Sequence, residues 1–362
     1  MSVPTSLTTR RARPAARRGG SGLSRLIVRR LLAVPVVLWI LATLVFLAMR
    51  LIPGSAATAL AGGGDGLSSE QVAQNQQQIS EALGLDRPLL SQYLTYLGDL
   101  LRFDLGQSFF GGNDVLRLLG SALPATLELT VAAMTIAVLI GGVTGLIAAV
   151  YRGTWIDTTI RAVGTVSFSL PWFALGVLSI VVFGVWLGWL PVLGRLPNSL
   201  GYEPTTNIVL LDAILQNRPD LVLPWISHLI LPATTLALSM AGYITRIVRA
   251  SVLEVRGEDF VRTARMKGMA ENAILLRHVL RNSALPIITV LGLQFGSLLG
   301  GAVITETVFA YPGVGGMVIS GVLQRDYPVV QGAALAIALL YTLVNLAVDL
   351  FYLVLDPRLR KG

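Results

Sequence analysis

Few side chains of this sequence could do chemistry, and they form none of the patterns that enzymes use. The 362 residues include only two histidines, His228 and His278, only two lysines and no cysteine. The sequence has no G-x-x-x-x-G-K-[ST] phosphate loop, no H-E-x-x-H zinc motif and no G-x-S-x-G nucleophile turn. The absence of cysteine also excludes thiolate metal ligands and thiol nucleophiles. We therefore expect no catalytic residue, metal or cofactor in this chain.

Carboxylates inside membrane spans could also do chemistry, because such groups often mark ion or proton paths. Glu128 follows Pro124 by four residues. We expect it in the first turn of a span, where a carboxylate complements the positive end of a helix. Asp349 lies near the end of the last apolar segment and is expected to pair with Arg358 or Arg360 or to cap a neighbouring group. These positions do not predict an ion relay.

The densest group of charges is the stretch EDFVRTARMKGMAENAILLRHVLRNSALP at 258–286, which separates two apolar segments. Gly268 is predicted to end a short helix, and Pro286 is expected to begin the next span. Apolar residues form a face on either side of the glycine: Phe260, Val261 and Ala264 before it, and Leu275, Leu276, Val279 and Leu280 after it. The segment could lie on lipid as an amphipathic helix, or fit a groove of a partner protein as a knob.

The composition indicates which elements hold these residues. Hydrophobic residues make up 54% of the chain and charged residues 13%, with a mean hydropathy of +0.70, whereas soluble domains carry about 25% charged residues. A helical span needs about 20 apolar residues. Windows free of Asp, Glu, Lys and Arg occur at 31–49, 129–150, 162–194, 221–245, 282–305 and 327–348. The sequence therefore predicts an all-α integral membrane protein with six transmembrane helices.

Two details of these windows carry further predictions. The window 162–194 is too long for one ordinary span, and Pro171 is expected to divide it into a lead-in helix and the span proper. Gly141-x-x-x-Gly145 and Gly296-x-x-x-Gly300 place small residues one turn apart, where helices can approach closely.

The positive charges predict the orientation. Of the 28 Lys and Arg residues, 21 lie in the N-terminal tail, 151–161, 246–281 and the C-terminal tail. Six lie in the segments that join the spans on the other side of the membrane. The positive-inside rule then places both termini and 246–281 in the cytoplasm. The net charge of +8 is thus explained by topology, and we expect no nucleic-acid partner.

The same pattern divides the chain into segments. We expect a disordered basic cytoplasmic tail at 1–28, a first transmembrane helix at 29–50 and an outer helical segment at 51–124. A five-helix core follows at 125–355, and a cytoplasmic tail at 356–362. Within the outer segment, Ser68 or Ser69 is predicted to cap a helix that stops at Gly84.

Cleavage near AATALA at 56–61 would make the first span a signal peptide, but its apolar run exceeds the usual signal core.

Several motifs resemble the dipeptide/oligopeptide/nickel family of ABC-importer inner-membrane permeases. These are the stretch 258–286, LGLDRPLLSQYLTYLGDLLRFDLGQSF (83–109), LPATLELT (123–130), ETVFAYPGVGGMVISGVLQRDYPVVQG (306–332) and LDPRLR (355–360). The long outer segment is similar to the B-type member of the permease pair. Ala270 departs from the family pattern, in which a Ser that could cap the second helix is common.

The resemblance implies a type I importer permease that forms half of a translocation pathway with a C-type permease. It further implies two ATPase subunits or one fused ATPase, which carry ATP and Mg, an extracytoplasmic substrate-binding lipoprotein and the bacterial inner membrane with its lipid. Residues 258–280 would dock on the ATPase. The residues that the resemblance assigns to this coupling are Glu258, Asp259, Phe260, Arg262, Ala264, Gly268, Leu275 and Leu276.

Polar residues inside the spans are candidates for the translocation pathway: Ser167, Ser169, Gln294 and Ser297. They could equally form hydrogen bonds between helices. Two other classes stay open, a secondary transporter or channel and a receptor or assembly scaffold. A secondary transporter would need an intramembrane ion site or an inverted repeat, and the sequence shows neither.

Overall fold

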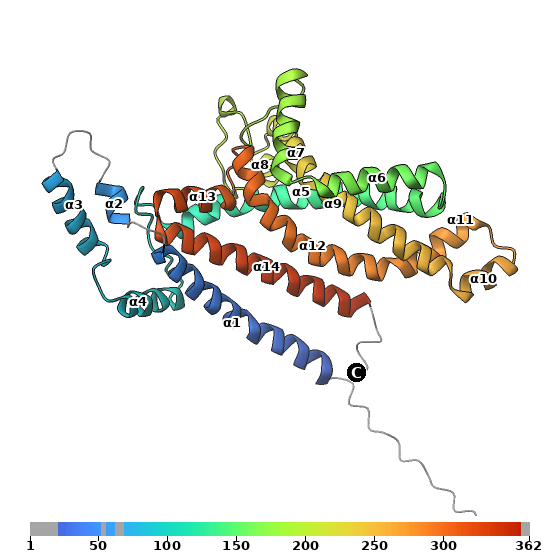
Figure 1. Cartoon of the computed structure of the whole chain (residues 1–362), viewed down its shortest axis with the longest axis horizontal. Coiled ribbons are helices and arrows are strands. Elements are labelled where there is room, and N and C mark those ends of the chain that lie inside the picture. Colours follow the sequence, from blue (N-terminus) through green and yellow to red (C-terminus); the bar gives the residue numbers. More distant parts are fainter. Residues whose placement is uncertain (1–20, 52–55, 62–68, 356–362) are drawn as a thin grey trace, which may run out of the picture.

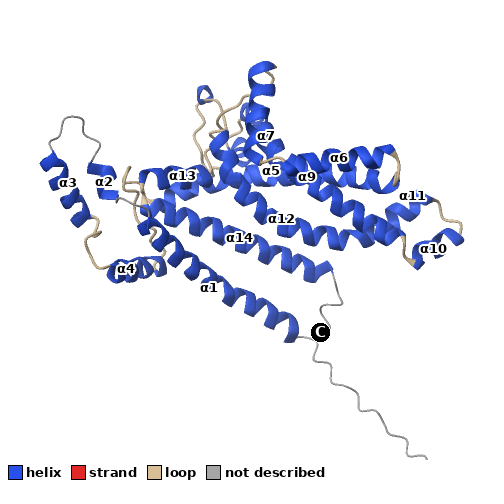
Figure 2. Ribbon diagram, viewed as in Figure 1, coloured by secondary structure: helices blue, strands red, loops and turns tan. Residues whose placement is uncertain are grey.

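The structure is a computed structural model and describes residues 21–51, 56–61 and 69–355. Within these ranges the regular structure is helical, apart from one isolated bridge between Gln107 and Asp114 (Figure 2). Of the predicted tails at 1–28 and 356–362, only residues 21–28 are described, and Ser68, one of the two predicted helix caps, also lies outside the described residues. The all-α prediction is confirmed.

The long helices are apolar enough to cross a membrane. The described part of the chain contains five single helices of this kind, and a bent pair supplies a sixth span. The single helices are α1 (Ser21–Leu51), α5 (Val115–Val150), α9 (Val222–Arg256), α12 (Leu280–Val308) and α14 (Tyr327–Leu355). The six-helix prediction is confirmed when the bent pair counts as one span.

The bent pair follows the expected division at Pro171. Helix α6 (Trp155–Ser169) ends before the proline, and α7 (Trp172–Ser179) continues into a π-helical turn at Ile180–Trp186. The two halves meet at 100°, so α7 points away from the long helices in Figure 1. Proline has no backbone N–H to continue the hydrogen bonds of the helix, and it disfavours helical dihedral angles in the residue before it.

Helices α5 and α9 lie side by side and form the centre of the fold. A Cβ atom at Gly141 would lie 2.7 Å from Cβ of Ile244, and one at Gly145 would lie 2.7 Å from the backbone oxygen of Thr245. Any side chain at either glycine would force the helices apart. The close approach predicted for this glycine pair is confirmed. Of the second pair, Gly296 packs against Tyr341 of α14, and Gly300 faces open space.

Shorter helices lie at the two ends of the long ones (Figure 1). One end carries α2 (Ala56–Ala61), α3 (Ser69–Ala82) and α4 (Leu89–Leu101), and the opposite end carries α10 (Asp259–Met266) and α11 (Glu271–Ile274). Helices α8 (Val209–Leu215) and α13 (Val314–Gln324) complete the fold. The predicted helix that stops at Gly84 is α3, and Gly84 has φ +64°.

Three helix boundaries differ from the sequence expectations. Helix α1 begins at Ser21, inside the segment expected to be disordered. Helix α5 begins at Val115, where the Asp114 side chain caps it by accepting a hydrogen bond from the Leu116 N–H at 2.7 Å. Pro124 and Pro286 lie inside α5 and α12 and do not begin spans. The absence of charges marks the apolar part of a span, but helices continue beyond it.

Candidate functional site

The charged stretch forms a compact loop beyond the ends of α9 and α12. Helix α10 ends at Met266, the chain turns through Gly268, and α11 begins after Ala270. Gly268 has φ +75°, a left-handed conformation that glycine adopts far more readily than other residues. A Cβ atom there would meet nothing within 4 Å. The turn therefore requires glycine for its backbone conformation and not for space.

Apolar residues fix this loop to the body of the protein. Val261, Ile274 and Val279 are at most 1% exposed, and Ala264 is 6% exposed. All belong to the main core, together with Val248 and Val252 of α9. The sequence predicts one apolar face of Phe260, Val261 and Ala264, but in the structure Val261 and Ala264 turn inward against the chain's own core and Phe260 is exposed. The loop is thus packed onto α9 as part of the same hydrophobic unit.

The opposite side of the loop is exposed. Phe260, Met266 and Leu276 are 42%, 76% and 66% exposed. Glu258, Asp259, Arg262 and Gly268 are also exposed, and Leu275 is half-buried. Met266 is not among the coupling residues that the resemblance implies. Its position in the last turn of the predicted helix, two residues before Gly268, is the signal that could have indicated it. These three residues are exposed at separate points of the loop, and we refer to Phe260, Met266 and Leu276 together as the exposed apolar face of the loop.

Polar contacts tie the loop to two long helices. Arg265 on α10 donates to Glu271 on α11 at 2.5 Å. Arg256, at the end of α9, lies 3.7 Å from the Glu271 carboxylate and donates to the backbone oxygen of Ala149 on α5 at 3.2 Å. A displacement of the loop would therefore act on both α9 and α5.

A buried hydrogen bond connects the second half of the loop to α9. The hydroxyl of Ser283 on α12 donates to the backbone oxygen of Ser251 at 3.2 Å. Ser283 is fully buried. Since α12 continues directly from the loop, α9 and α12 are held together where both meet it.

The candidate pathway residues lie on two different helices. Ser167 and Ser169 are on α6, and the Ser169 hydroxyl donates to the backbone oxygen of Thr165 at 2.8 Å. Gln294 and Ser297 are on α12; Gln294 is half-buried and its amide lies 3.4 Å from the sulfur of Met240, while Ser297 is exposed. Both helices pack on α9. No contact between the two groups supports a shared site, and their role stays a prediction.

The expectation for Glu128 is wrong. Glu128 lies in the middle of α5, and its carboxylate accepts hydrogen bonds from Arg195 at 2.6 Å, the Val209 N–H at 2.7 Å and the Trp225 indole at 3.1 Å. The Arg195 and Glu128 side chains are 9% and 8% exposed. The buried pair anchors the segment 195–220 to α5. Nothing in the local sequence around Glu128 indicated a partner so far along the chain.

The other candidate chemical groups lie apart. His228 is on α9, with its ring Nδ1 2.8 Å from the backbone oxygen of Pro224. His278 lies in the π-helical turn before α12. Over the described ranges, no group of three or more His, Cys, Asp or Glu side chains could hold a metal ion.

Comparison with known proteins decides the family. The family model "Binding-protein-dependent transport system inner membrane component" matches residues 141–361, and the model for the N-terminal part of such membrane components matches residues 23–130. The chain belongs to this family. The resemblance inferred from the motifs is confirmed.

Curated relatives agree over most of the permease. The chain is 41% identical to the di/tripeptide transport system permease protein DppB of Pseudomonas aeruginosa, over 88% of this chain and 93% of that protein. It is 43% identical to the probable D,D-dipeptide transport system permease protein DdpB of Escherichia coli, over 88% and 92%. It is also 38% identical to the glutathione transport system permease protein GsiC of Escherichia coli, over 92% and 98%.

A solved structure supports the fold. The permease superposes with a TM-score of 0.52 on a chain of the inward-facing MetNI methionine ABC transporter, at 18% identity, covering 67% of this chain and 97% of that one. The type I importer architecture is thereby confirmed. The protein is a multi-pass permease subunit of the inner membrane, and its family works with ATPase and substrate-binding components.

Proposed function

We propose that this chain is the B-type permease of an ATP-driven importer for peptides or related small solutes. It would form half of the translocation pathway beside a C-type permease. Both termini and the segment 246–281, which contains the loop, would face the cytoplasm. Helices α2–α4 would face outward. The names of the di/tripeptide, D,D-dipeptide and glutathione relatives support this class of solute.

The exposed apolar face carries the proposal. Phe260, Met266 and Leu276 lie on a loop whose inner side is packed into the main core. Fully burying a side chain of this size contributes about 1.5–3 kcal/mol, so a groove on an ATPase subunit that covered them would bind the loop firmly. Glu258, Asp259 and Arg262 would surround this contact. These charged residues would orient the loop on the ATPase more than they would strengthen its binding.

The ties between the loop and the spans suggest how coupling works. ATP and Mg bind and react on the ATPase subunits, and this permease supplies no catalytic group. When the ATPases close, the docked loop moves with them. Arg256 and the Ser283–Ser251 bond pass that movement to α9, α5 and α12. The equilibrium shifts because the ATPases bind ATP more tightly in one arrangement than in the other.

Reconstitution tests this proposal. The permease is placed in proteoliposomes with its paired permease, the ATPases and the substrate-binding lipoprotein, and uptake of a labelled dipeptide is followed. Uptake should require ATP hydrolysis and survive an ionophore that collapses ion gradients. Uptake that continues without ATP but stops with the ionophore would instead identify a secondary transporter.

A further inference from the structure

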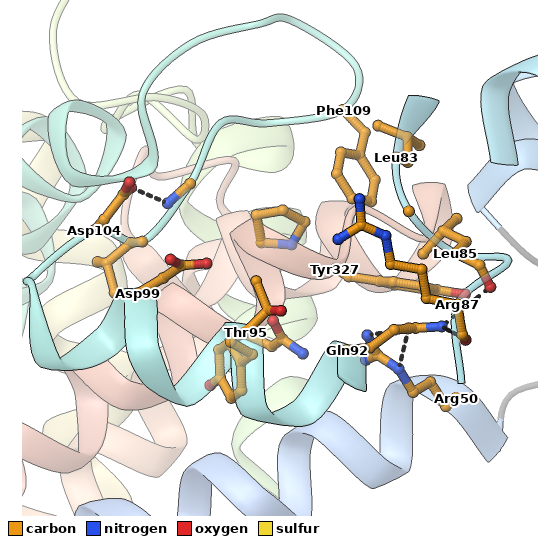
Figure 3. Close-up of a pocket in the computed structure, with 16 residues that line it drawn as sticks. Arg50, Leu83, Leu85, Arg87, Gln92, Thr95, Asp99, Asp104, Phe109 and Tyr327 are labelled. Atoms are coloured by element: carbon orange, nitrogen blue, oxygen red, sulfur yellow. Dashed lines mark hydrogen bonds between the residues drawn. The ribbon is translucent and has the colours of Figure 1, made fainter. Parts of the chain in front are cut away.

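A pocket of about 210 Å³ lies at the outer end of the chain, between α1, α4 and the start of α14 (Figure 3). It is separate from the coupling loop at the other end of the long helices. Pockets for drug-sized ligands usually measure about 300–1,000 Å³. This pocket therefore suits a smaller solute, of the size of an amino acid or a small dipeptide.

Arg50 places a positive charge in the wall of this pocket. Its Nε and Nη2 donate to Oε1 of Gln92 at 3.1 and 2.9 Å, and its guanidinium carbon lies 3.5 Å from the centre of the Phe46 ring. Within the described residues, no carboxylate forms an ion pair with Arg50. Gln92 is itself fixed by donating to the backbone oxygens of Leu85 and Arg87, so the cation is held in place by neutral groups.

Two further polar groups in the wall are buried without a partner. Gln331 on α14 is 7% exposed, and its Nε2 has no hydrogen-bond partner. The hydroxyl of Tyr96 on α4 is also buried and unpaired. Most buried donors in folded proteins are paired. Both atoms have almost no solvent-accessible surface, so they can donate hydrogen bonds to a carboxylate beside Arg50 only after the Tyr96 and Gln331 side chains turn toward the pocket that they line.

The opposite side of the pocket is acidic. Asp99 and Asp104 also line the pocket, and Figure 3 shows them on the side away from Arg50 and Arg87. Asp104 accepts a hydrogen bond from the Gly106 N–H at 2.8 Å, which fixes its orientation. The pocket thus presents cations and neutral donors at one end and carboxylates at the other.

We propose that this pocket binds the zwitterion of a free amino acid or dipeptide. The carboxylate lies against Arg50, Tyr96 and Gln331, and the ammonium group lies toward Asp99 and Asp104. A simple anion would meet the same donors but would gain nothing from the acidic end. The inference rests on the proposed function, which orients the pocket toward the outside of the cell. It adds a solute-binding site that this chain forms alone.

The test uses the complete transporter in nanodiscs without the substrate-binding protein, with alanylalanine as probe and calorimetric titration as readout. Saturable binding is expected. Amidating the carboxyl group or acetylating the amine should each weaken binding by about tenfold to a hundredfold, as expected for losing a charge-assisted contact. Equal binding of the amide and the free acid would overturn the proposal, as would an absence of saturable binding.

Two variants separate ligand binding from folding. Tyr96→Phe and Gln331→Met each remove an unpaired buried donor, so the melting temperature should stay the same or rise. Both should still weaken alanylalanine binding about tenfold. Asp99→Asn should weaken alanylalanine but leave the N-acetylated peptide unchanged. Arg102→Gln and Asp86→Asn are exposed controls outside the pocket wall, and binding that fell equally in them would contradict the assignment.

Uptake assays on the same complexes distinguish this inference from the proposed function. If ATP-driven dipeptide uptake occurs but alanylalanine does not bind to the transporter alone, the pocket assignment fails and the function stands. If the pocket variants alter binding as expected but uptake does not depend on ATP, the function fails and the pocket assignment stands.

Discussion

Gly268 offers the sharpest perturbation of the coupling loop. Its φ of +75° is unfavourable for a residue with a side chain, by roughly 1–2 kcal/mol. A Cβ atom would meet nothing within 4 Å, so we expect backbone strain to be the main effect of a substitution inside the chain. In Gly268→Val, relief of the strain would rotate α11 relative to α10 and displace the exposed apolar face.

The size of the effect follows from that strain. A change of 1.4 kcal/mol is a factor of ten in an equilibrium, so docking in Gly268→Val should weaken by roughly five- to thirtyfold. The body of the permease should insert and fold normally, because the strain is small and local. Substrate uptake and ATP turnover, measured in the same proteoliposomes, should show fewer molecules transported per ATP.

Two variants serve as matched controls. Gly153 has φ +79°, also with no atom within 4 Å of its Cβ position, and lies in the turn between α5 and α6 at the same end as the loop. Gly153→Val should carry similar strain and leave coupling unchanged. Gly268→Asn should be milder than Gly268→Val, since asparagine tolerates this conformation better. Wild-type transport per ATP in Gly268→Val would refute the reasoning.

Three further predictions concern the loop, the segment 195–220 and the topology. Ala264→Trp should overpack the core beneath the loop and lower stability by about 1–3 kcal/mol, seen as a lower melting temperature even without the ATPases; an unchanged melting temperature would show that Ala264 is not enclosed. Arg195→Ala should lower the free energy of unfolding by about 3–5 kcal/mol by leaving the Glu128 carboxylate buried without a counter-ion, and adding Glu128→Leu should recover much of the loss in thermal unfolding. In this cysteine-free chain, Glu70→Cys should react with an impermeant thiol reagent from outside and Asn272→Cys only from inside, so labelling of both from outside would reject the orientation.

The sequence predicted features that depend on local pattern. Spans follow from long apolar runs, and the turn at Gly268 follows from a glycine after a short amphipathic helix. The bend at Pro171 follows from proline's effect on its neighbours. Each of these outcomes depends on residues close together in the chain, and all three are present in the structure.

Features that depend on distant contacts were missed. Glu128 pairs with Arg195 across a long stretch of chain, and neither residue's neighbourhood indicates the other. The inward direction of Ala264 is set by how the loop packs into the main core, which periodicity cannot determine for a helix of two turns. The pocket at Arg50 combines residues from α1, α4 and α14, so its donors and acids gather only in the folded chain.

The central claim is that the exposed apolar face docks on an ATPase subunit, and cross-linking tests it most directly. Leu276→Cys introduces a single thiol at an exposed position, which is labelled with a benzophenone maleimide in the assembled transporter and irradiated. We expect a covalent product of permease and ATPase that is absent when Glu70→Cys carries the label. A Leu276 label that reacts only with lipid would contradict the docking claim and identify the loop as a helix on the membrane surface.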